Sequence, residues 1–117
     1  MAITYNRQVP IILEIGWHRA RVIKVVEGKP VNTMYGLSDT VLITFETEYG
    51  GIVSQSFKML KGTNALLEKL ITVTVGEDTG DIDLESLVQL YCGIKVDHNY
   101  GKQDRLFVNV VDVCPID

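Results

Sequence analysis

The residues with the clearest capacity for chemistry are tyrosines and cations in two polar stretches. Each stretch combines a tyrosine with at least one cation: Lys29, Met34 and Tyr35 in the first, and Tyr100, Lys102 and Arg105 in the second. Single-stranded nucleic acid is bound by cations that follow the phosphates and by aromatic rings on which bases stack, each stacked base contributing about 1–3 kcal/mol. The two stretches therefore predict a nucleic-acid-binding surface if the fold brings them to one side. The alternative is a pair of ordinary solvated loops.

Further cations are positioned to lengthen such a surface. Arg19, Arg21 and Lys24 lie in the first predicted strand, within 16–28. Lys58 and Lys61 lie at and after the end of the third, 52–59. Large apolar side chains nearby are assigned to the interior. Trp17 is expected to be a core or rim side chain, and Phe45 and Phe57 are in phase with the apolar positions of their strands.

Catalytic and metal-binding chemistry finds little support in residue types and spacing. His18 and His98 are far apart and have no cysteine or second histidine at ligand spacing. Asp78, Asp81 and Asp83 share an acidic segment that lacks the spacing of a calcium-binding loop. No phosphate-binding glycine loop, activated nucleophile or opposed carboxylate pair is recognisable. We therefore predict a protein that is not an enzyme and uses no metal or cofactor.

The two cysteines and the chain's hydropathy suggest a compartment. Cys92 and Cys114 have no CxxC spacing, which favours two reduced thiols, with a disulfide across the C-terminal hairpin as the alternative. The N-terminal residues do not resemble a secretion signal, and the apolar runs are shorter than a membrane span. A cytoplasmic protein without a membrane partner is expected.

Length and charge point to one nearly neutral domain with a localised acidic loop. A chain of 117 residues predicts a single domain spanning 1–117. The net charge is −4, but segment 77–85 holds five of the 15 acidic residues and no basic one. The remaining 10 acidic residues face 11 Lys and Arg elsewhere. An anionic partner is therefore expected away from that segment.

The first half of the chain has strand periodicity interrupted by a polar loop. In segment 16–28 the apolar phase slips near Val22–Ile23, which predicts a bulge in a long, bent strand. Segment 27–39 is predicted to be a loop from its Gly, Pro, Asn and Asp content. Strands are predicted over 40–48 and 52–59, with Met59 in the buried phase and a tight turn at 49–51 between them.

The second half changes period and then returns to strands. A helix is predicted over 63–71 with Thr63 or Asn64 as N-cap, and a short helical turn over 84–91 with Asp83 as cap. Gly93 is expected to end that turn. Residues 94–99 and 106–111 then alternate as the two strands of a hairpin that stops before Pro115.

The order of these elements predicts a mainly β fold of the OB type. Five strands, with a helix between the third and fourth and a short helical turn before the fourth, match a five-stranded Greek-key barrel. Residues 1–15 are then an N-terminal extension or an extra strand at "VPIILEI". A split sandwich, or a roll that includes this extra strand, is the alternative fold.

Several segments together resemble a family of small phage and mobile-element proteins. They are "GWHRARVIKV", "VLITFETEYGGIVSQSFKM", "NALLEKL" and "DLESLVQLYCGIKVDHNYGKQDRLFVNVVDVCP". The resemblance spans about 14–116 and rests on layout and anchor residues: Gly16, Trp17, Phe45, Gly51, Phe57, Leu87, Gly93, Gly101 and Pro115. Some members of that family look like single-stranded DNA-binding proteins encoded beside recombination functions.

This resemblance implies a non-catalytic, sequence-tolerant single-stranded DNA-binding protein. Its partners would be single-stranded DNA and the recombination or replication proteins of the same element. The alternative function is a protein–protein adaptor of that element, in which the barrel edge or the loops dock a partner. Two questions stay open at this point: whether the ligand is DNA or RNA, and whether copies associate, for example through an exposed "VPIILEI" strand.

Overall fold

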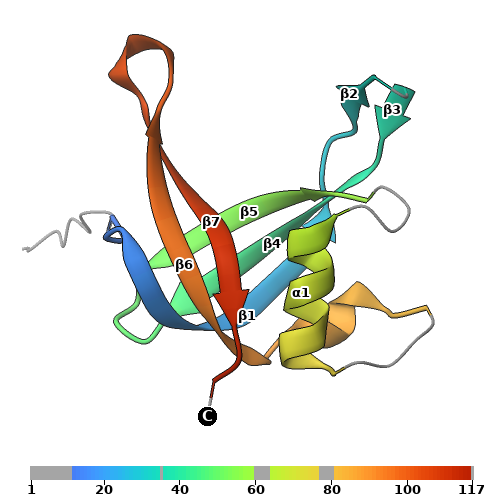
Figure 1. Ribbon diagram of the computed structural model, residues 1–117, viewed down its shortest axis with the longest axis vertical. Coiled ribbons are helices and arrows are strands. Elements are labelled where there is room, and N and C mark those ends of the chain that lie inside the picture. Colours follow the sequence, from blue (N-terminus) through green and yellow to red (C-terminus); the bar gives the residue numbers. More distant parts are fainter. Residues whose placement is uncertain (1–11, 35, 60–63, 77–80, 117) are drawn as a thin grey trace, which may run out of the picture.

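The computed structural model describes four stretches of the chain, 12–34, 36–59, 64–76 and 81–116. They contain seven strands, one α-helix and two short 3₁₀ helices (Figure 1). In chain order these are β1 (Gly16–Glu27), β2 (Val31–Thr33), β3 (Gly36–Ser38), β4 (Thr40–Thr47), β5 (Ile52–Lys58), α1 (Ala65–Thr74), η1 (Leu84–Leu87), β6 (Tyr91–Tyr100), η2 (Lys102–Asp104) and β7 (Leu106–Cys114). The predicted mainly β character is confirmed.

Five of the strands form one antiparallel sheet in the order β5-β4-β1-β6-β7. The central strand β1 is long and bent (Figure 1). Its first half pairs with β6 and its second half with β4, and the register shifts between Val22 and Lys24. The predicted bulge is thereby confirmed, and it lets one strand serve two partners whose directions diverge.

The two edge strands of this sheet curl toward each other. Gln55 of β5 accepts a hydrogen bond from the backbone N–H of Val110 in β7, with an N···O distance of 3.0 Å. In the described part of the chain no backbone ladder joins β5 to β7, so the sheet is strongly curved without being closed into a barrel. A side-chain amide occupies the seam where a closed barrel would have ladder hydrogen bonds.

The core lies inside the curved sheet and under α1. Phe45 and Phe57 are 0% and 2% exposed, as their strand phases predict. Leu67 and Leu70 of α1 join the same apolar cluster, and Asn64 caps the helix by accepting a hydrogen bond from the N–H of Leu67. The helix therefore begins at Ala65, slightly later than predicted, and runs on to Thr74.

Three predictions of local structure are wrong. Segment 27–39 is not a plain loop, because β2 and β3 form a separate two-stranded hairpin within it. The helical turn stops at Leu87, and Gly93 does not end it but lies inside β6, opposite Arg19 and Cys114. Met59 follows β5 and is 49% exposed.

The residues just before β1 are part of the fold although they form no strand. Leu13 is 5% exposed, and its carbonyl oxygen is 2.6 Å from Nε2 of His98 in β6. Its side chain also fills the space beside Gly51 in the β4–β5 turn. The predicted extra strand is absent over 12–15, and 9–11 lie outside the described residues.

Among the described residues, no helix is long and apolar enough to cross a membrane. Cys92 and Cys114 are both free thiols, so the hairpin is not cross-linked.

Candidate functional site

The β2–β3 hairpin and the β6–β7 turn project from the same end of the sheet, and they are splayed apart (Figure 1). We call this end, with the predicted residues Lys29, Tyr100, Lys102 and Arg105, the loop end. All four side chains are exposed, and Tyr100 is 68% exposed. Met34 on the other hairpin is 88% exposed, whereas Tyr35 lies outside the described residues. The two predicted stretches therefore do share one end of the molecule.

The β6–β7 turn holds a cation over an aromatic ring. The guanidinium carbon of Arg105 is 5.8 Å from the ring centroid of Phe107, within the range of a cation–π contact. Gly101 allows this packing, since a β-carbon there would overlap the Phe107 ring. Sequence alternation assigned Phe107 to the polar phase of its strand, and this is why its role here was not anticipated.

The turn itself has unusual backbone geometry. Gln103 and Asp104 have φ angles of 63° and 55°, in the left-handed region that residues other than glycine rarely adopt. The N–H of Gly101 donates to the carbonyl of Arg105 at 2.9 Å and closes the turn. This conformation presents Lys102 and Arg105 to solvent on a compact tip.

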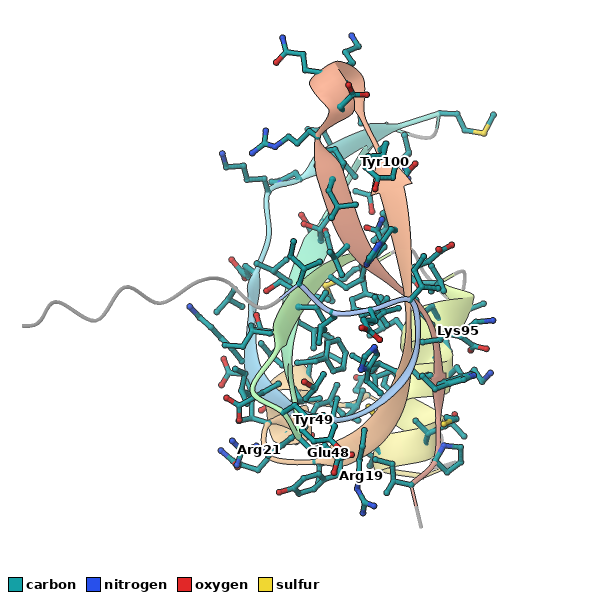
Figure 2. All side chains as sticks on the ribbon, turned by 90° about the vertical axis from the view of Figure 1, so that its left-hand side faces the viewer. Arg19, Arg21, Glu48, Tyr49, Lys95 and Tyr100 are labelled. Carbon is teal, nitrogen blue, oxygen red and sulfur yellow. The ribbon has the colours of Figure 1, made fainter. Side chains whose placement is uncertain are left out.

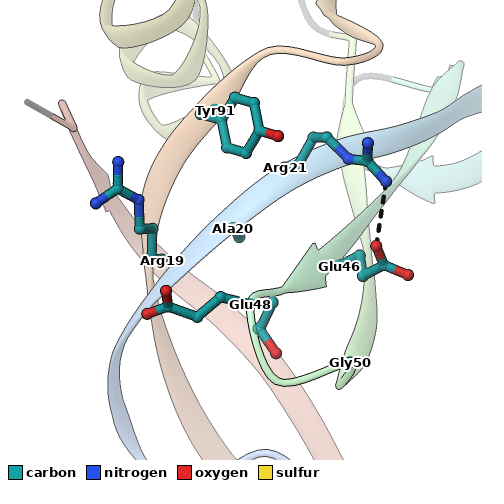
Figure 3. Close-up of a pocket in the computed structure, with 8 residues that line it drawn as sticks. Arg19, Ala20, Arg21, Glu46, Glu48, Gly50 and Tyr91 are labelled. Carbon is teal, nitrogen blue, oxygen red and sulfur yellow. Dashed lines mark hydrogen bonds and ion pairs between the residues drawn. The ribbon is translucent and has the colours of Figure 1, made fainter.

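Arg19 and Arg21 lie at the opposite end from Tyr100 (Figure 2). Together with Tyr91 and the β4–β5 turn they line a shallow depression of about 480 Å³ (Figure 3). Arg21 is 3.1 Å from Glu46 Oε1 and 3.1 Å from Gln89 Oε1. Glu48 borders the same depression. The depression is therefore mixed in charge. One of the two arginines that line it, Arg21, forms an ion pair with the Glu46 carboxylate.

The remaining predicted cations are dispersed. Lys24 is exposed on β1 at the bulge, where it pairs with Thr44. Lys58 is exposed at the end of β5, and its carbonyl accepts a hydrogen bond from the side chain of Asn64. Lys61 lies outside the described residues. The sequence-predicted cations thus form two groups at opposite ends with isolated cations elsewhere.

The outer face of β1 and β6 brings together residues that sequence analysis did not combine. The β1–β6 register places Trp17 opposite Lys95, Arg19 opposite Gly93 and Arg21 opposite Tyr91. Trp17 is 51% exposed, so it is not a core side chain, and Tyr91 is 58% exposed. Tyr91 was assigned to a helical turn, and only the observed start of β6 reveals its position on this face.

Several titratable groups of the described residues have structural surroundings that account for them. Burial, together with the neighbouring Cys114, raises the pKa of the Cys92 thiol from 9.0 to about 12, which keeps the thiol protonated at neutral pH. The ring nitrogens Nε2 of His18 and His98 lie 2.6 Å from the backbone carbonyls of Glu14 and Leu13. Both histidines therefore serve to hold the segment before β1.

The acidic residues have structural partners as well. Asp83 caps η1 by accepting a hydrogen bond from the N–H of Glu85, as predicted. Asp112 pairs with Lys69 at 2.7 Å, and this hydrogen bond lowers the pKa of the Asp112 carboxyl. In the described stretches no three His, Cys, Asp or Glu side chains are grouped to hold a metal ion, and Asp78 lies outside them.

In the described stretches, exposed aromatic rings and cations occur together at the loop end and on the outer face of β1 and β6. Comparison with known proteins adds no candidate. No protein-family model matches the chain, and no curated protein matches it.

Proposed function

We propose that the protein is a non-catalytic, sequence-tolerant single-stranded DNA-binding protein with an OB-like fold. The observation that carries the proposal is the sheet order β5-β4-β1-β6-β7 with α1 between β5 and β6 in the chain. If the sheet strands β1, β4, β5, β6 and β7 are counted 1 to 5 along the chain, the sheet order is 3-2-1-4-5. This is the neighbour order expected of an OB-fold, a barrel that is often partly open. The unclosed seam between β5 and β7 is compatible with such a barrel.

The location of the loops supports the same proposal. In an OB-fold the second and third strands, with the loops joining strands 1–2 and 4–5, form the usual binding surface. Here those loops are the β2–β3 hairpin and the β6–β7 turn, which project from one end of the sheet (Figure 1). Tyr100 supplies a ring, and Lys102 and Arg105 supply cations that make no ion pair with other described residues.

The resemblance drawn from the sequence extends the proposal to origin and partners. On that resemblance, the protein comes from a phage or mobile element. It acts in the cytoplasm together with the recombination or replication proteins of that element.

A protein–protein adaptor is the second candidate, because apolar side chains are exposed on the other projection of the loop end. Met34 and Leu37 on the β2–β3 hairpin are 88% and 76% exposed, and apolar tips of this kind are typical anchors of protein interfaces. The net charge of −4 favours the adaptor, since it opposes an anionic ligand at long range.

Binding of a labelled oligo(dT) of about 20–30 nucleotides, followed by fluorescence anisotropy, separates the two candidates. Binding should weaken as salt rises, with a log–log slope of about −0.7 for each phosphate neutralised. Lys102→Ala should reduce the magnitude of this slope by about 0.7. Lys24→Ala removes the same charge from an isolated position at the β1 bulge and should leave the slope unchanged. No binding at about 50 mM salt would exclude the DNA-binding proposal and favour the adaptor.

A further inference from the structure

Trp17 is fixed on the outer face of the sheet with half of its surface open to solvent. It lies in β1 directly opposite Lys95 of β6. Its Cε3 atom is 3.8 Å from the position that a β-carbon would take on Gly93, so the indole leans across the glycine. The side chain nevertheless remains 51% exposed. One part of the indole thus rests on the sheet while the rest faces solvent.

Gly93 is required for this arrangement. A β-carbon at Gly93 would overlap Sγ of Cys114, which occupies the space above the glycine from β7. The indole and the Cys114 side chain therefore approach Gly93 from the two neighbouring strands, in space that its missing side chain leaves open. An aromatic side chain held in this way loses little rotamer freedom when a ligand stacks on it.

The side chain directly opposite Trp17 on β6 is a cation, Lys95. Lys95 is exposed and makes no ion pair with any acidic residue of the described stretches. Asp112 lies directly opposite Lys95 on β7; its hydrogen bond with Lys69 at 2.7 Å and, to a smaller extent, the charge of Lys95 lower the pKa of its carboxyl, so Lys95 has an acidic neighbour that Lys69 shares. Asp97, two residues along β6, accepts a hydrogen bond from the backbone N–H of His98 at 2.8 Å. Arg21 farther along β1 differs, because Glu46 compensates it.

We infer that Trp17 and Lys95 form a nucleotide-binding subsite, where a base of single-stranded nucleic acid stacks on the indole and a neighbouring phosphate binds the ammonium group. We call this pair, together with Gly93, the Trp17 platform. The inference rests on the proposed function and adds a contact surface outside the loop end. Stacking of bases on sheet-borne aromatics beside cations is a general mode of single-strand recognition.

The platform lies along β6 at some distance from the loop end. Lys95 and Tyr100 belong to the same strand and are about 17 Å apart at the rise of a β-strand, but because they are five residues apart their side chains start from opposite faces of β6. Figure 2 shows Lys95 at a level between Tyr100 and Arg19. The Trp17 platform is therefore a separate contact on the outer face, between the β6–β7 turn and the mixed-charge depression, and Tyr100 does not belong to that face.

Trp17 is the single tryptophan of the chain, so its fluorescence reports on this subsite alone. Addition of oligo(dT) should quench Trp17 emission and reduce its quenching by iodide. Trp17→Ala should weaken binding of a labelled oligonucleotide by about 5- to 150-fold, the range expected for one stacked base. Trp17→Phe keeps a ring and should retain most of the affinity. Lys95→Ala should reduce the magnitude of the salt slope by about 0.7.

Tyr49→Ala is the matched control, since Tyr49 is an 85% exposed aromatic in the β4–β5 turn, off the platform, and its removal should leave affinity unchanged. Lys95→Glu, an exposed substitution that spares the core, keeps the test decisive if Trp17→Ala folds poorly. Oligonucleotide binding with unchanged Trp17 emission, and unchanged affinity for Lys95→Glu, would overturn the platform and leave the proposed function standing. Absence of any binding at about 50 mM salt would overturn both.

Discussion

The loop end and the Trp17 platform both combine aromatic rings with cations, but the backbone holds them in different ways. On the platform, the β1–β6 ladder fixes Trp17 opposite Lys95, and the missing side chain of a buried glycine leaves space for the indole. At the loop end, Lys102 and Arg105 lie on a turn with two left-handed residues, and their side chains are exposed. One region is organised by the sheet, and the other is presented by a turn.

This difference predicts a division of energetic roles. Exposed cations act on phosphates through long-range attraction, which salt screens strongly. A ring held on a sheet contributes stacking, which depends little on salt. The loop end should therefore govern the salt dependence and association rate of a bound strand, while the platform should govern how long a base stays in place.

The largest expected effect comes from Leu13, which anchors the chain just before the platform. Leu13→Ala should lower the free energy of unfolding by about 2–5 kcal/mol, because it opens a cavity beside the β4–β5 turn. Urea denaturation measures this loss. Amide hydrogen exchange should show that protection falls more at Trp17 and His18 than at the tip of the β6–β7 hairpin.

Ile12→Ala is the matched control, since Ile12 is adjacent and 60% exposed. Its effect on the free energy of unfolding should stay within about 0.5 kcal/mol. Equal effects of the two substitutions would show that the segment before β1 does not anchor the platform.

An intermediate effect is expected from the two glycines that support the two regions. Gly93→Ala should lower the free energy of unfolding by about 1–3 kcal/mol, because Gly93 is buried and its new β-carbon must displace Sγ of Cys114 while it comes into contact with the Trp17 indole. Gly101→Ala should cost less than about 1 kcal/mol, because the overlapping Phe107 ring is 45% exposed and can move outward. Gly101 has a φ of −90°, which alanine adopts without strain.

Urea denaturation of both variants, with Trp17 emission as a local readout, tests this pair. Gly93→Ala should shift the emission maximum, and Gly101→Ala should not. A loss at Gly101 as large as that at Gly93 would mean that the turn is packed as tightly as the sheet.

These contrasts also explain which features were predictable from the sequence. The bulge near Val22, the buried phases of Phe45 and Phe57 and the Asn64 cap each depend on residues close in the chain, and each is confirmed. Local periodicity carries such information because it fixes which side chains share a face.

The features that were missed depend on register between distant strands. Gly93 looks like a helix stop in isolation, yet its role is set by Trp17 and Cys114 on two other strands. Trp17 was expected in the core or at the rim, and its 51% exposure excludes the core; alternation gives the phase of a strand and does not say whether another layer covers that face. The seam between β5 and β7, bridged by Gln55, is a long-range contact of the same kind.

The smallest expected effect concerns the Arg21–Glu46 pair, which marks where the positive part of the outer face ends. The two side chains are 34% and 39% exposed and 3.1 Å apart, so the pair should contribute only about 0.2–1 kcal/mol to folding. A double-mutant cycle with Arg21→Ala and Glu46→Gln measures this coupling, which should shrink as salt rises.

The same cycle tests the electrostatic boundary. Glu46→Gln removes the carboxylate that compensates Arg21, so oligo(dT) affinity should rise modestly at low salt, and the rise should vanish in the Arg21→Ala background. Equal gains in both backgrounds would instead attribute the change to net charge alone. In that case the outer face would attract DNA only through the net charge of the protein. The Trp17 platform would then differ from the loop end only in the stacking of a base on Trp17.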